Sequence, residues 1–388
     1  MPNCTINVTM FGGRRCGKTS VVTAMNRNFE DVFGGKSDLV ISQSDYDTMR
    51  FIEEKEQDIN GFFLNKPYGE FNTDGRPTPD GSEYLFDLQL RGRANQDRIT
   101  LSLFDFPGEW LDDKDKNQVL AGKLKNCGVI MIAIDSPYLM EPLSDVLKSE
   151  HTVGRWNDQR NYCKRISSMV KNYFTPNWGL EQKMILFVPL KCEKYYACGQ
   201  MGTLNLKIKE AYKDLLNYVN TGDARKHYEV AIAPILTFGK DTVLFSRFQE
   251  DEDGNLVMDA RNRLPTVPLF KFQNREANYS PQFCEQPLLY ALSYLLYQVE
   301  QAKKQEWAKR MWFGKFIQLM GEAFGNWASA KDFLEQRDKI QRHLKTSGDG
   351  YEILSDPLSL KGRVDARIQP NPFDLKGKAE AILNRGKK

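Results

Sequence analysis

A glycine-rich segment near the start of the chain has the composition and spacing of a phosphate-binding loop. In "MFGGRRCGKTS", residues 10–20, Gly12 is followed by four residues and then by Gly17, Lys18 and Thr19. In such a loop, backbone N–H groups surround a β-phosphate, the lysine contacts the β- and γ-phosphates, and the threonine hydroxyl binds Mg²⁺. The predicted phosphate-contacting residues are Gly12, Gly13, Arg14, Arg15, Cys16, Gly17, Lys18, Thr19 and Ser20.

The residues on either side of this loop have the patterns of a strand and a helix. "TINVTMF" alternates and is rich in β-branched residues, which predicts a strand. "KTSVVTAMNRNF" places Val21, Val22 and Met25 on one side of a helix. Because a phosphate-binding loop needs a strand before it and a helix after it, a chance glycine turn explains this segment poorly.

A second motif with the chemistry of a magnesium site lies further along the chain. "SEYLFDLQLRGRANQDRITLSLFDFPGEW" predicts two strands joined by a polar turn near residues 92–96. The second strand, 99–104, delivers Asp105 at the start of "DFPG". A carboxylate at the end of an apolar strand can hold Mg²⁺, usually through water, and the N–H of Gly108 could donate to a γ-phosphate. We therefore predict Thr19 and Asp105 as Mg²⁺ ligands.

The rest of the predicted sheet comes from three apolar segments separated by helices. We expect strands at 127–135, 184–190 and 229–237 and helices at 157–173 and 204–219. Strands that alternate with helices form a mostly parallel sheet covered on both faces, and ligands bind at the carboxyl ends of its strands. The phosphate-binding loop, Asp105, Lys191 and Thr237 all follow such ends, so we expect them to meet at one site.

Composition and charge exclude several other classes of protein. Apolar residues make up 41% of the chain, enough for a packed core, and a net charge of +3 is too small for a general nucleic-acid binder. The seven cysteines form no CxxC pair and there are three histidines, which disfavours a zinc site and fits a reducing compartment. The chain opens on a predicted strand rather than a signal peptide, and its apolar runs are too short to span a bilayer. We expect a cytoplasmic protein with no specific nucleic-acid partner.

The order of these motifs resembles that of the TRAFAC-class P-loop GTPases, the group that includes Ras-like proteins and translation factors. The resemblance covers residues 4–300, and "PGE" after the aspartate and "PLKCEKYY" on the later strand are most similar to the bacterial double-GTPase families of conflict and anti-phage operons. It implies a three-layer α/β GTPase domain with a mostly parallel sheet. It also implies GTP or GDP with Mg²⁺ as ligands, hydrolysis in a molecular switch, and a protein partner that the same operon could encode.

The resemblance also assigns a base-recognition motif. Where the class has Asn/Thr-Lys-x-Asp, this chain has Leu190-Lys191-Cys192-Glu193. The stem of Lys191 would lie along the purine, and Glu193 would accept hydrogen bonds from guanine on a longer arm than aspartate. Because Leu190 replaces a polar residue, an ATPase stays open as an alternative, as does a loop that faces solvent. The last class motif, Ser-Ala-Lys, corresponds only by position to residues 237–240.

A Mg²⁺-binding threonine is implied in the loop before the first strand of the antiparallel pair. "FNTDGRPTPDGSEYLF" offers Thr73 and Thr78, and Thr78 has the better distance from that strand. The Gly, Pro and Asp content is typical of a mobile loop, as an order–disorder switch requires; a plain surface threonine is the alternative. Residues 45–63 have a helical pattern and belong to an insertion near 31–81.

Three charged residues are candidates for the hydrolytic step. Glu109 follows Gly108, where Ras-like relatives have the glutamine that orients the attacking water. Glu109 could orient water or act as a base, and Arg14 or Arg15 could neutralise the transferred phosphoryl group or hold Glu109 in place. Two alternatives stay open: the arginines face solvent or a partner chain, or the protein is a nucleotide-bound scaffold (a pseudo-GTPase) with weak hydrolysis.

The chain is expected to divide into a GTPase domain, residues 1–300, and a helical extension, residues 301–388. In a further insertion, 243–275, Asp253-Gly254 predicts a β-hairpin and "TVPLFKFQ" a third strand, and "EQPLLYALSYLLYQVEQAKK" predicts the closing helix. The extension holds 18 Lys/Arg and 11 Asp/Glu, with a helix of aromatic residues beside basic ones. That helix could pack on the domain, dock a partner or contact a membrane, and the basic tail is expected to be partly disordered. A homo-oligomer also stays open.

Overall fold

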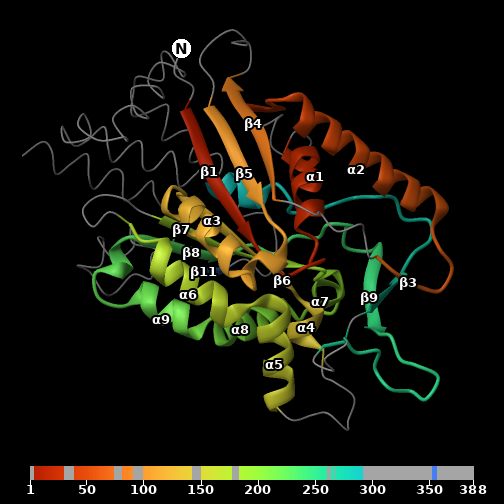
Figure 1. Ribbon diagram of the computed structural model, residues 1–388. Helices are drawn as coiled ribbons and strands as arrows, with labels where there is room; N and C mark the ends of the chain where they lie inside the picture. Colours follow the sequence, from red (N-terminus) through yellow and green to blue (C-terminus); the bar gives the residue numbers. More distant parts are fainter. Residues whose placement is uncertain are drawn as a thin grey trace, which may run out of the picture.

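The chain forms a three-layer α/β structure with a small second sheet at its side (Figure 1). The computed structural model describes residues 4–29, 39–73, 81–90, 99–141, 150–176, 183–259, 264–265, 267–291 and 352–355. Within these ranges the main sheet has eight strands and the second sheet has three. The predicted fold class is confirmed.

The main sheet is parallel at its centre and antiparallel at its edges. In spatial order its strands are β11 (Glu352–Ser355), β8 (Tyr228–Ile232), β7 (Lys183–Leu190), β6 (Val129–Asp135), β1 (Cys4–Phe11), β5 (Ile99–Asp105), β4 (Ser82–Leu90) and β2 (Leu39–Gln43). The strands from β8 to β5 run parallel, whereas β11, β4 and β2 run antiparallel to their neighbours. Asp105 of β5 lies opposite Met10 of β1, so β5 ends beside the phosphate-binding loop.

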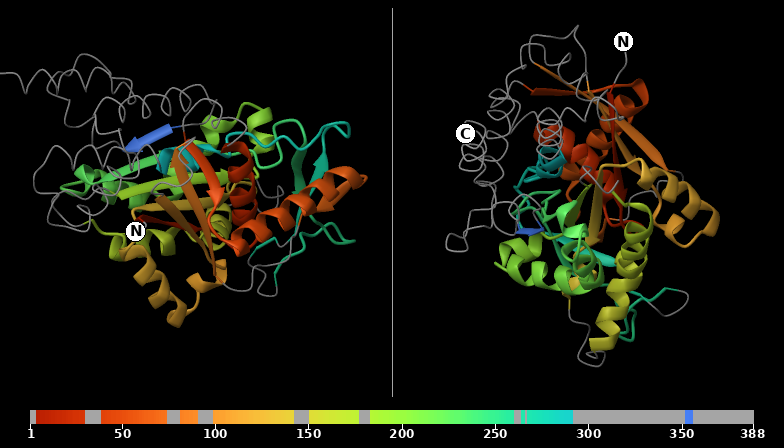
Figure 2. Two further views of the ribbon diagram at one scale, coloured as in Figure 1. Left: turned by 90° about the horizontal axis from the view of Figure 1, so that it is seen from above. Right: turned by 90° about the vertical axis from the view of Figure 1, so that its left-hand side faces the viewer.

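Alternate side chains of the central strands pack into two separate cores. In β6, the odd-numbered residues from Val129 to Ala133 belong to one core, and the even-numbered residues from Ile130 to Ile134 belong to the other. The first core is covered by α1 (Lys18–Asn28) and α2 (Tyr46–Asn65). The second is covered by α3 (Lys114–Lys125), α6 (Cys163–Tyr173), α8 (Met201–Ala211) and α9 (Lys213–Asn220) (Figure 2). Burial on both faces explains the unbroken apolar run of this strand.

Two predicted helices are each interrupted, and one predicted strand is shorter than expected. The first helix is two helices, α5 (Glu150–Asn161) and α6, separated by Tyr162, whose φ of 53° is left-handed. The second is likewise split into α8 and α9. β8 ends at Ile232 rather than at residue 237. Pro234 follows this end, and a proline has no N–H to donate to a strand ladder.

The small sheet contains the predicted hairpin insertion, with a different pairing. Its order is β3 (Glu70–Asn72), β10 (Pro268–Phe272) and β9 (Val243–Phe248). The chain turns at Asp251–Asn255 as predicted, but residues 255–259 make only isolated bridges. β9 pairs instead with β10, the strand predicted as the third.

A third core of aromatic residues joins the small sheet to the end of α2. Phe62 and Phe63 of α2 contact Phe272 of β10, with ring centroids 5.4 and 5.6 Å apart. Both also contact Phe238, which follows β8. In Figures 1 and 2 the small sheet lies beside the C-terminal end of α2. The small sheet, α2 and the segment after β8 therefore support one another.

After residue 285 the structure describes two parts of the chain, residues 286–291 and residues 352–355. Residues 286–291 are helical and form the start of the predicted closing helix, and β11 adds an antiparallel edge strand to the main sheet. The predicted aromatic and basic helix and the basic tail lie outside the described residues, and the boundary at residue 300 stays a prediction. No helix within the described ranges is long and apolar enough to cross a membrane.

Candidate functional site

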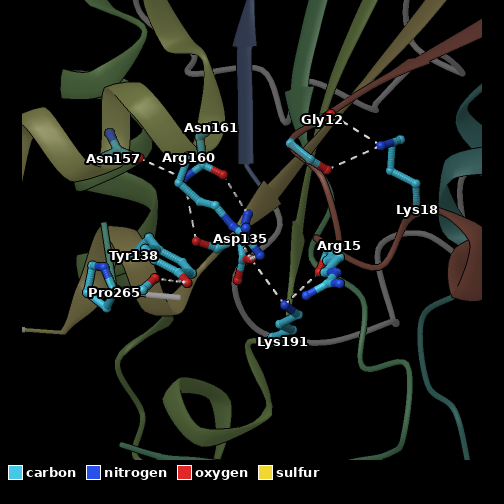
Figure 3. Close-up of polar contacts among 11 residues, drawn as sticks. Gly12, Arg15, Lys18, Asp135, Tyr138, Asn157, Arg160, Asn161, Lys191 and Pro265 are labelled. Atoms are coloured by element: carbon cyan, nitrogen blue, oxygen red, sulfur yellow. Dashed lines mark hydrogen bonds and ion pairs between the residues drawn. The ribbon is translucent and has the colours of Figure 1, made fainter. Parts of the chain in front are cut away.

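The loop between β1 and α1 folds around the side chain of Lys18. Lys18 Nζ donates to the carbonyl oxygens of Gly12 at 3.2 Å and Gly13 at 3.3 Å (Figure 3), and the side chain is buried. Gly17, just before α1, has a left-handed φ of 105°, which a side chain would strain. The loop thus places a buried ammonium group at the N-terminus of a helix, where an anion is stabilised.

Asp105 and Thr19 lie together beside Lys18, as the sequence predicts. Thr19 Oγ1 donates to Asp105 Oδ2 at 3.2 Å, and Lys18 Nζ lies 3.8 Å from Asp105 Oδ1. Burial raises the pKa of the Asp105 carboxyl, and the charge of Lys18 partly lowers it. Ionised Asp105 is therefore stabilised mainly by the cation next to it.

The same pair of residues fits the predicted Mg²⁺ site. Asp105 Oδ1 is buried and accepts no hydrogen bond from the described residues, so one carboxylate oxygen remains for a ligand. The described part of the chain has no group of three or more His, Cys, Asp or Glu that could hold a metal. Mg²⁺ commonly uses one or two protein oxygens together with water and phosphate, which a hydroxyl and a carboxylate at this position can supply.

Gly108 packs directly on the backbone of the phosphate-binding loop. A Cβ at this position would lie 2.5 Å from the Arg14 nitrogen and 2.7 Å from the Gly13 carbonyl carbon. The short helix η2 (Gly108–Leu111) therefore begins in contact with the loop, and only a glycine permits this approach. The predicted donation from Gly108 N–H to a γ-phosphate would start from this position.

Replacement of Gly108 by alanine is expected to weaken nucleotide binding by roughly tenfold, because overpacking costs about 1–3 kcal/mol and here displaces the loop. The affinity for fluorescently labelled GDP measures the effect. Gly122→Ala is the matched control, since a Cβ at Gly122 in α3 meets nothing within 4 Å. Equal affinities of the two variants would contradict the prediction.

Arg14 and Glu109 form an ion pair at the edge of the loop. Arg14 Nε lies 2.8 Å from Glu109 Oε1, and the two side chains are 50% and 49% exposed. The neighbouring Arg15 has a left-handed φ of 56°, and its carbonyl oxygen accepts a hydrogen bond from Lys191 Nζ at 3.0 Å. Of the two roles predicted for the arginines, the geometry shows pairing with Glu109 for Arg14.

These groups meet in one cleft of about 950 Å³, counting the solvent at its mouth. The predicted residues that line it are the loop residues from Arg14 to Ser20, with Asp105, Gly108, Glu109 and Lys191. Gly12, Gly13 and Glu193 are not part of the lining. The sequence motifs therefore converge on one cleft at the carboxyl ends of the strands, where ligands bind in sheets of this kind.

Only one of the two candidate switch threonines can be placed. Thr73 lines the cleft and directly follows β3, so the small sheet carries the segment that leads to it. Thr78, which the sequence favours, lies outside the described residues, and its role as a Mg²⁺ ligand stays a prediction.

The opposite wall of the cleft follows the ends of β7 and β8. Leu190, Lys191, Thr237 and Phe238 line it. Glu193 lies behind this wall: it is buried and accepts hydrogen bonds from Phe238 N–H at 3.2 Å and Thr237 Oγ1 at 3.4 Å. Glu193 therefore holds the segment after β8 in place, while its predicted contact with a guanine base stays a prediction.

Burial raises the pKa of the Glu193 carboxyl from 4.5 to about 7. Because the folded state then binds more protons than the unfolded state between these two values, stability falls as pH rises from about 5 to about 7 and levels off above. Glu193→Gln keeps the accepting oxygen but does not titrate. Between pH 5 and pH 8 its free energy of unfolding is therefore expected to fall by about 2 kcal/mol less than that of the wild type. Urea unfolding of both proteins from pH 5 to pH 8 measures the difference. A difference that stays constant with pH would contradict the prediction.

Two residues near the cleft carry no motif and are missed by the sequence predictions. Asp135, the last residue of β6, is fully buried, and its Oδ2 lies 2.9 Å from Arg160 Nε and 3.1 Å from Lys191 Nζ (Figure 3). Arg160 comes from the end of α5. One signal could have found Asp135: a carboxylate that ends an unbroken apolar run, at the sheet edge where the site was expected.

The geometry agrees with a comparison of the sequence with known families. Residues 6–217, more than half of the chain, match the family model described as Double-GTPase 2. The chain belongs to the Double-GTPase 2 family. This confirms the predicted resemblance, and the matched residues contain the phosphate-binding loop, Asp105, Glu109 and Lys191. The part of the cleft wall formed by Thr237 and Phe238 lies beyond the stretch that matches Double-GTPase 2.

No curated protein matches this double-GTPase chain. The chain is similar to two crystal structures of the S. cerevisiae Ski7 GTPase-like domain. In one the domain is bound to GDP and inorganic phosphate, and in the other it is bound to GTP. For each, the identity is 10%, the TM-score is 0.27, and the alignment covers 60% of this chain and 43% of the Ski7 chain. The chain therefore spans less than half the length of these structural relatives.

Proposed function

We propose that this double-GTPase protein binds GTP and GDP with Mg²⁺ in the cleft and hydrolyses GTP as a molecular switch. One observation carries the proposal: Lys18, Thr19 and Asp105 come from two separate segments and meet within 3.8 Å. A lysine, a hydroxyl and a carboxylate in this order are the groups that bind a nucleotide triphosphate and its metal.

The predicted site residues have separate roles in this proposal. Lys18 and the loop N–H groups bind the β- and γ-phosphates, and Thr19 and Asp105 hold Mg²⁺, which neutralises phosphate charge when bound. Glu109 orients the attacking water or accepts its proton, and Arg14 neutralises charge on the transferred phosphoryl group. Lys191 contacts the base. Glu193 either supports the cleft wall beside the base or contacts the base itself.

The switch is proposed to act through Thr73 and the strand that precedes it. Thr73 follows β3, and Glu70 of β3 accepts hydrogen bonds from Ser246 at 2.6 Å and Arg247 at 3.0 Å in β9. If Thr73 coordinates the metal, it would therefore displace β3, which these hydrogen bonds hold in the small sheet. We propose that a cytoplasmic protein partner senses this change, in a bacterial conflict or anti-phage system as the resemblance implies.

A second candidate function is a nucleotide-bound scaffold with weak hydrolysis. It is favoured by Glu109, because a carboxylate beside the γ-phosphate adds like-charge repulsion that a glutamine does not. The scaffold and the hydrolase require the same binding residues and differ only in turnover.

Turnover of GTP and ATP by the full chain, with Mg²⁺ and with a chelator, tests the proposal. GTP hydrolysis that requires Mg²⁺ and is lost in Lys18→Ala would support it. Preference for ATP would correct the base, and tight binding of GTP without turnover would favour the scaffold. Failure to bind either nucleotide would overturn both candidates.

A further inference from the structure

The buried Asp135 carboxylate is the centre of a charged cluster beneath the cleft. One oxygen, Oδ2, lies 2.9 Å from Arg160 Nη2, 2.9 Å from Arg160 Nε and 3.1 Å from Lys191 Nζ. The Asp135 side chain is fully buried, and those of Arg160 and Lys191 are only 14% and 12% exposed. Because buried charges are costly unless they are paired, each cation in this cluster depends on the single carboxylate.

The cluster is held from the side away from the nucleotide site. Asp135 N–H donates to Asn161 Oδ1 at 2.8 Å, and Asn161 Nδ2 donates to Asn157 Oδ1 at 2.7 Å, one turn earlier in α5. The Arg160 guanidinium lies 4.7 Å from the ring centre of Tyr138, whose hydroxyl donates to Pro265 O at 2.6 Å. Asp135 and Arg160 are thus fixed to helix α5 and, through Tyr138, to residues near the small sheet.

On its other side the cluster is joined to the phosphate-binding loop. Lys191 Nζ, besides its contact with Asp135, donates to the carbonyl oxygen of Arg15 at 3.0 Å. Gly13 lies against the end of α5, where a Cβ would come within 2.1 Å of Arg160 O. The loop is therefore in contact with the cluster at two points, one through a side chain and one through the backbone.

Neither Asp135 nor Arg160 lines the cleft, whereas Lys191 and Arg15 do. We propose that Asp135 and Arg160 are positioning residues that fix the Lys191 ammonium on the Arg15 carbonyl and so set the affinity for the nucleotide. Asp135 attracts Lys191, and Arg160 orients the carboxylate with two N–H groups, so that Oδ2 faces the lysine. This inference rests on the proposed function, since it concerns the same cleft.

A double-mutant cycle between Asp135 and Lys191 tests this role, with affinities for fluorescently labelled GDP and GTP in the presence of Mg²⁺. Asp135→Asn is expected to weaken both nucleotides by roughly tenfold in the wild-type background and by less than about threefold in a Lys191→Met background. GTP turnover at saturation should fall far less than the affinity, because neither Asp135 nor Arg160 lines the cleft in which the proposed hydrolysis takes place. Equal losses in both backgrounds would overturn the proposal, since Asp135 would then act on the fold and not through Lys191.

A second variant keeps the test decisive if Asp135→Asn does not fold. Arg160→Lys keeps the charge but loses the paired N–H groups, and it is expected to weaken both nucleotides by about threefold to tenfold, again only when Lys191 is present. Glu141→Gln is the matched control: Glu141 accepts hydrogen bonds from Lys194 at 2.6 Å and Tyr195 at 2.7 Å, and none of these three residues lines the cleft. Affinity unchanged in Arg160→Lys, or reduced equally in Glu141→Gln, would overturn the proposal. Absence of binding by the wild type would instead overturn the proposed function.

Discussion

Replacement of Lys18 by alanine is expected to weaken nucleotide binding by at least about thirtyfold. Lys18 is buried, bridges the carbonyl oxygens of Gly12 and Gly13, and lies 3.8 Å from Asp105. Truncation of one partner of a desolvated charged contact costs about 2–5 kcal/mol, which corresponds to a loss of roughly thirtyfold to several thousandfold in affinity. Equilibrium titration with labelled GDP and GTP measures it directly.

The same substitution is expected to weaken Mg²⁺ binding through Asp105. Burial already raises the pKa of this carboxyl and Lys18 counteracts it, so the alanine variant raises the pKa further and favours the protonated form, which holds Mg²⁺ poorly. The affinity of the alanine variant for Mg²⁺ should therefore increase as pH rises. Lys125→Ala, at an exposed position of α3, removes the same charge and is the control. If both variants bind alike, the loop does not hold the phosphates.

The sequence predicts the site best where chemistry is carried by neighbouring residues. The phosphate-binding loop is contiguous, and Asp105 follows a strongly apolar strand, so both could be placed before the fold was known. The unbroken apolar run of β6 likewise requires a strand that is buried on both faces. These elements meet in the structure as expected, because parallel strands bring their carboxyl ends to one edge.

The missed strands are short and depend on distant partners. β3 has three residues and β11 has four, and they pair with strands nearly two hundred and more than one hundred residues away. A segment of this length has too few residues for an alternating pattern, and its pairing is decided by packing elsewhere in the fold. The sequence also did not predict the pairing of β9 with β10. The turn at Asp253 favoured pairing of β9 with the segment directly after that turn.

The charged cluster beneath the cleft could not be predicted for a related reason. Asp135 and Arg160 are 25 residues apart in the sequence, and their contact exists only because the end of helix α5 lies against the end of β6. Glu193 has the position expected of a base-recognition residue, yet its carboxylate is bonded behind the wall to Phe238. Sequence spacing fixes which residues reach the site, whereas the direction of a side chain depends on packing.

Arg14→Ala is expected to lower the single-turnover rate of GTP hydrolysis by on the order of a hundredfold or more, with a change in GTP affinity of less than about threefold. Arginines that neutralise a transferred phosphoryl group contribute about a thousandfold or more. Arg14 pairs with Glu109 at 2.8 Å, but both side chains are half exposed, and such pairs are worth less than about 1 kcal/mol. The arginine can therefore leave Glu109 for the phosphate when a triphosphate binds. Enzyme in excess over GTP, followed by quenched-flow assay of phosphate, isolates this step.

Arg15→Ala is the matched control, because it removes the same charge from the same loop while the Arg15 carbonyl still accepts from Lys191. We expect a loss of less than about tenfold for this variant, and similar losses in both variants would indicate a general charge effect instead. The background Glu109→Gln separates the two roles of Arg14. If Arg14 only holds Glu109 in place, Arg14→Ala has no further effect in that background, whereas direct neutralisation of the phosphoryl group predicts a further loss of at least about tenfold. We expect the further loss, because an ion pair this exposed is too weak to fix a carboxylate.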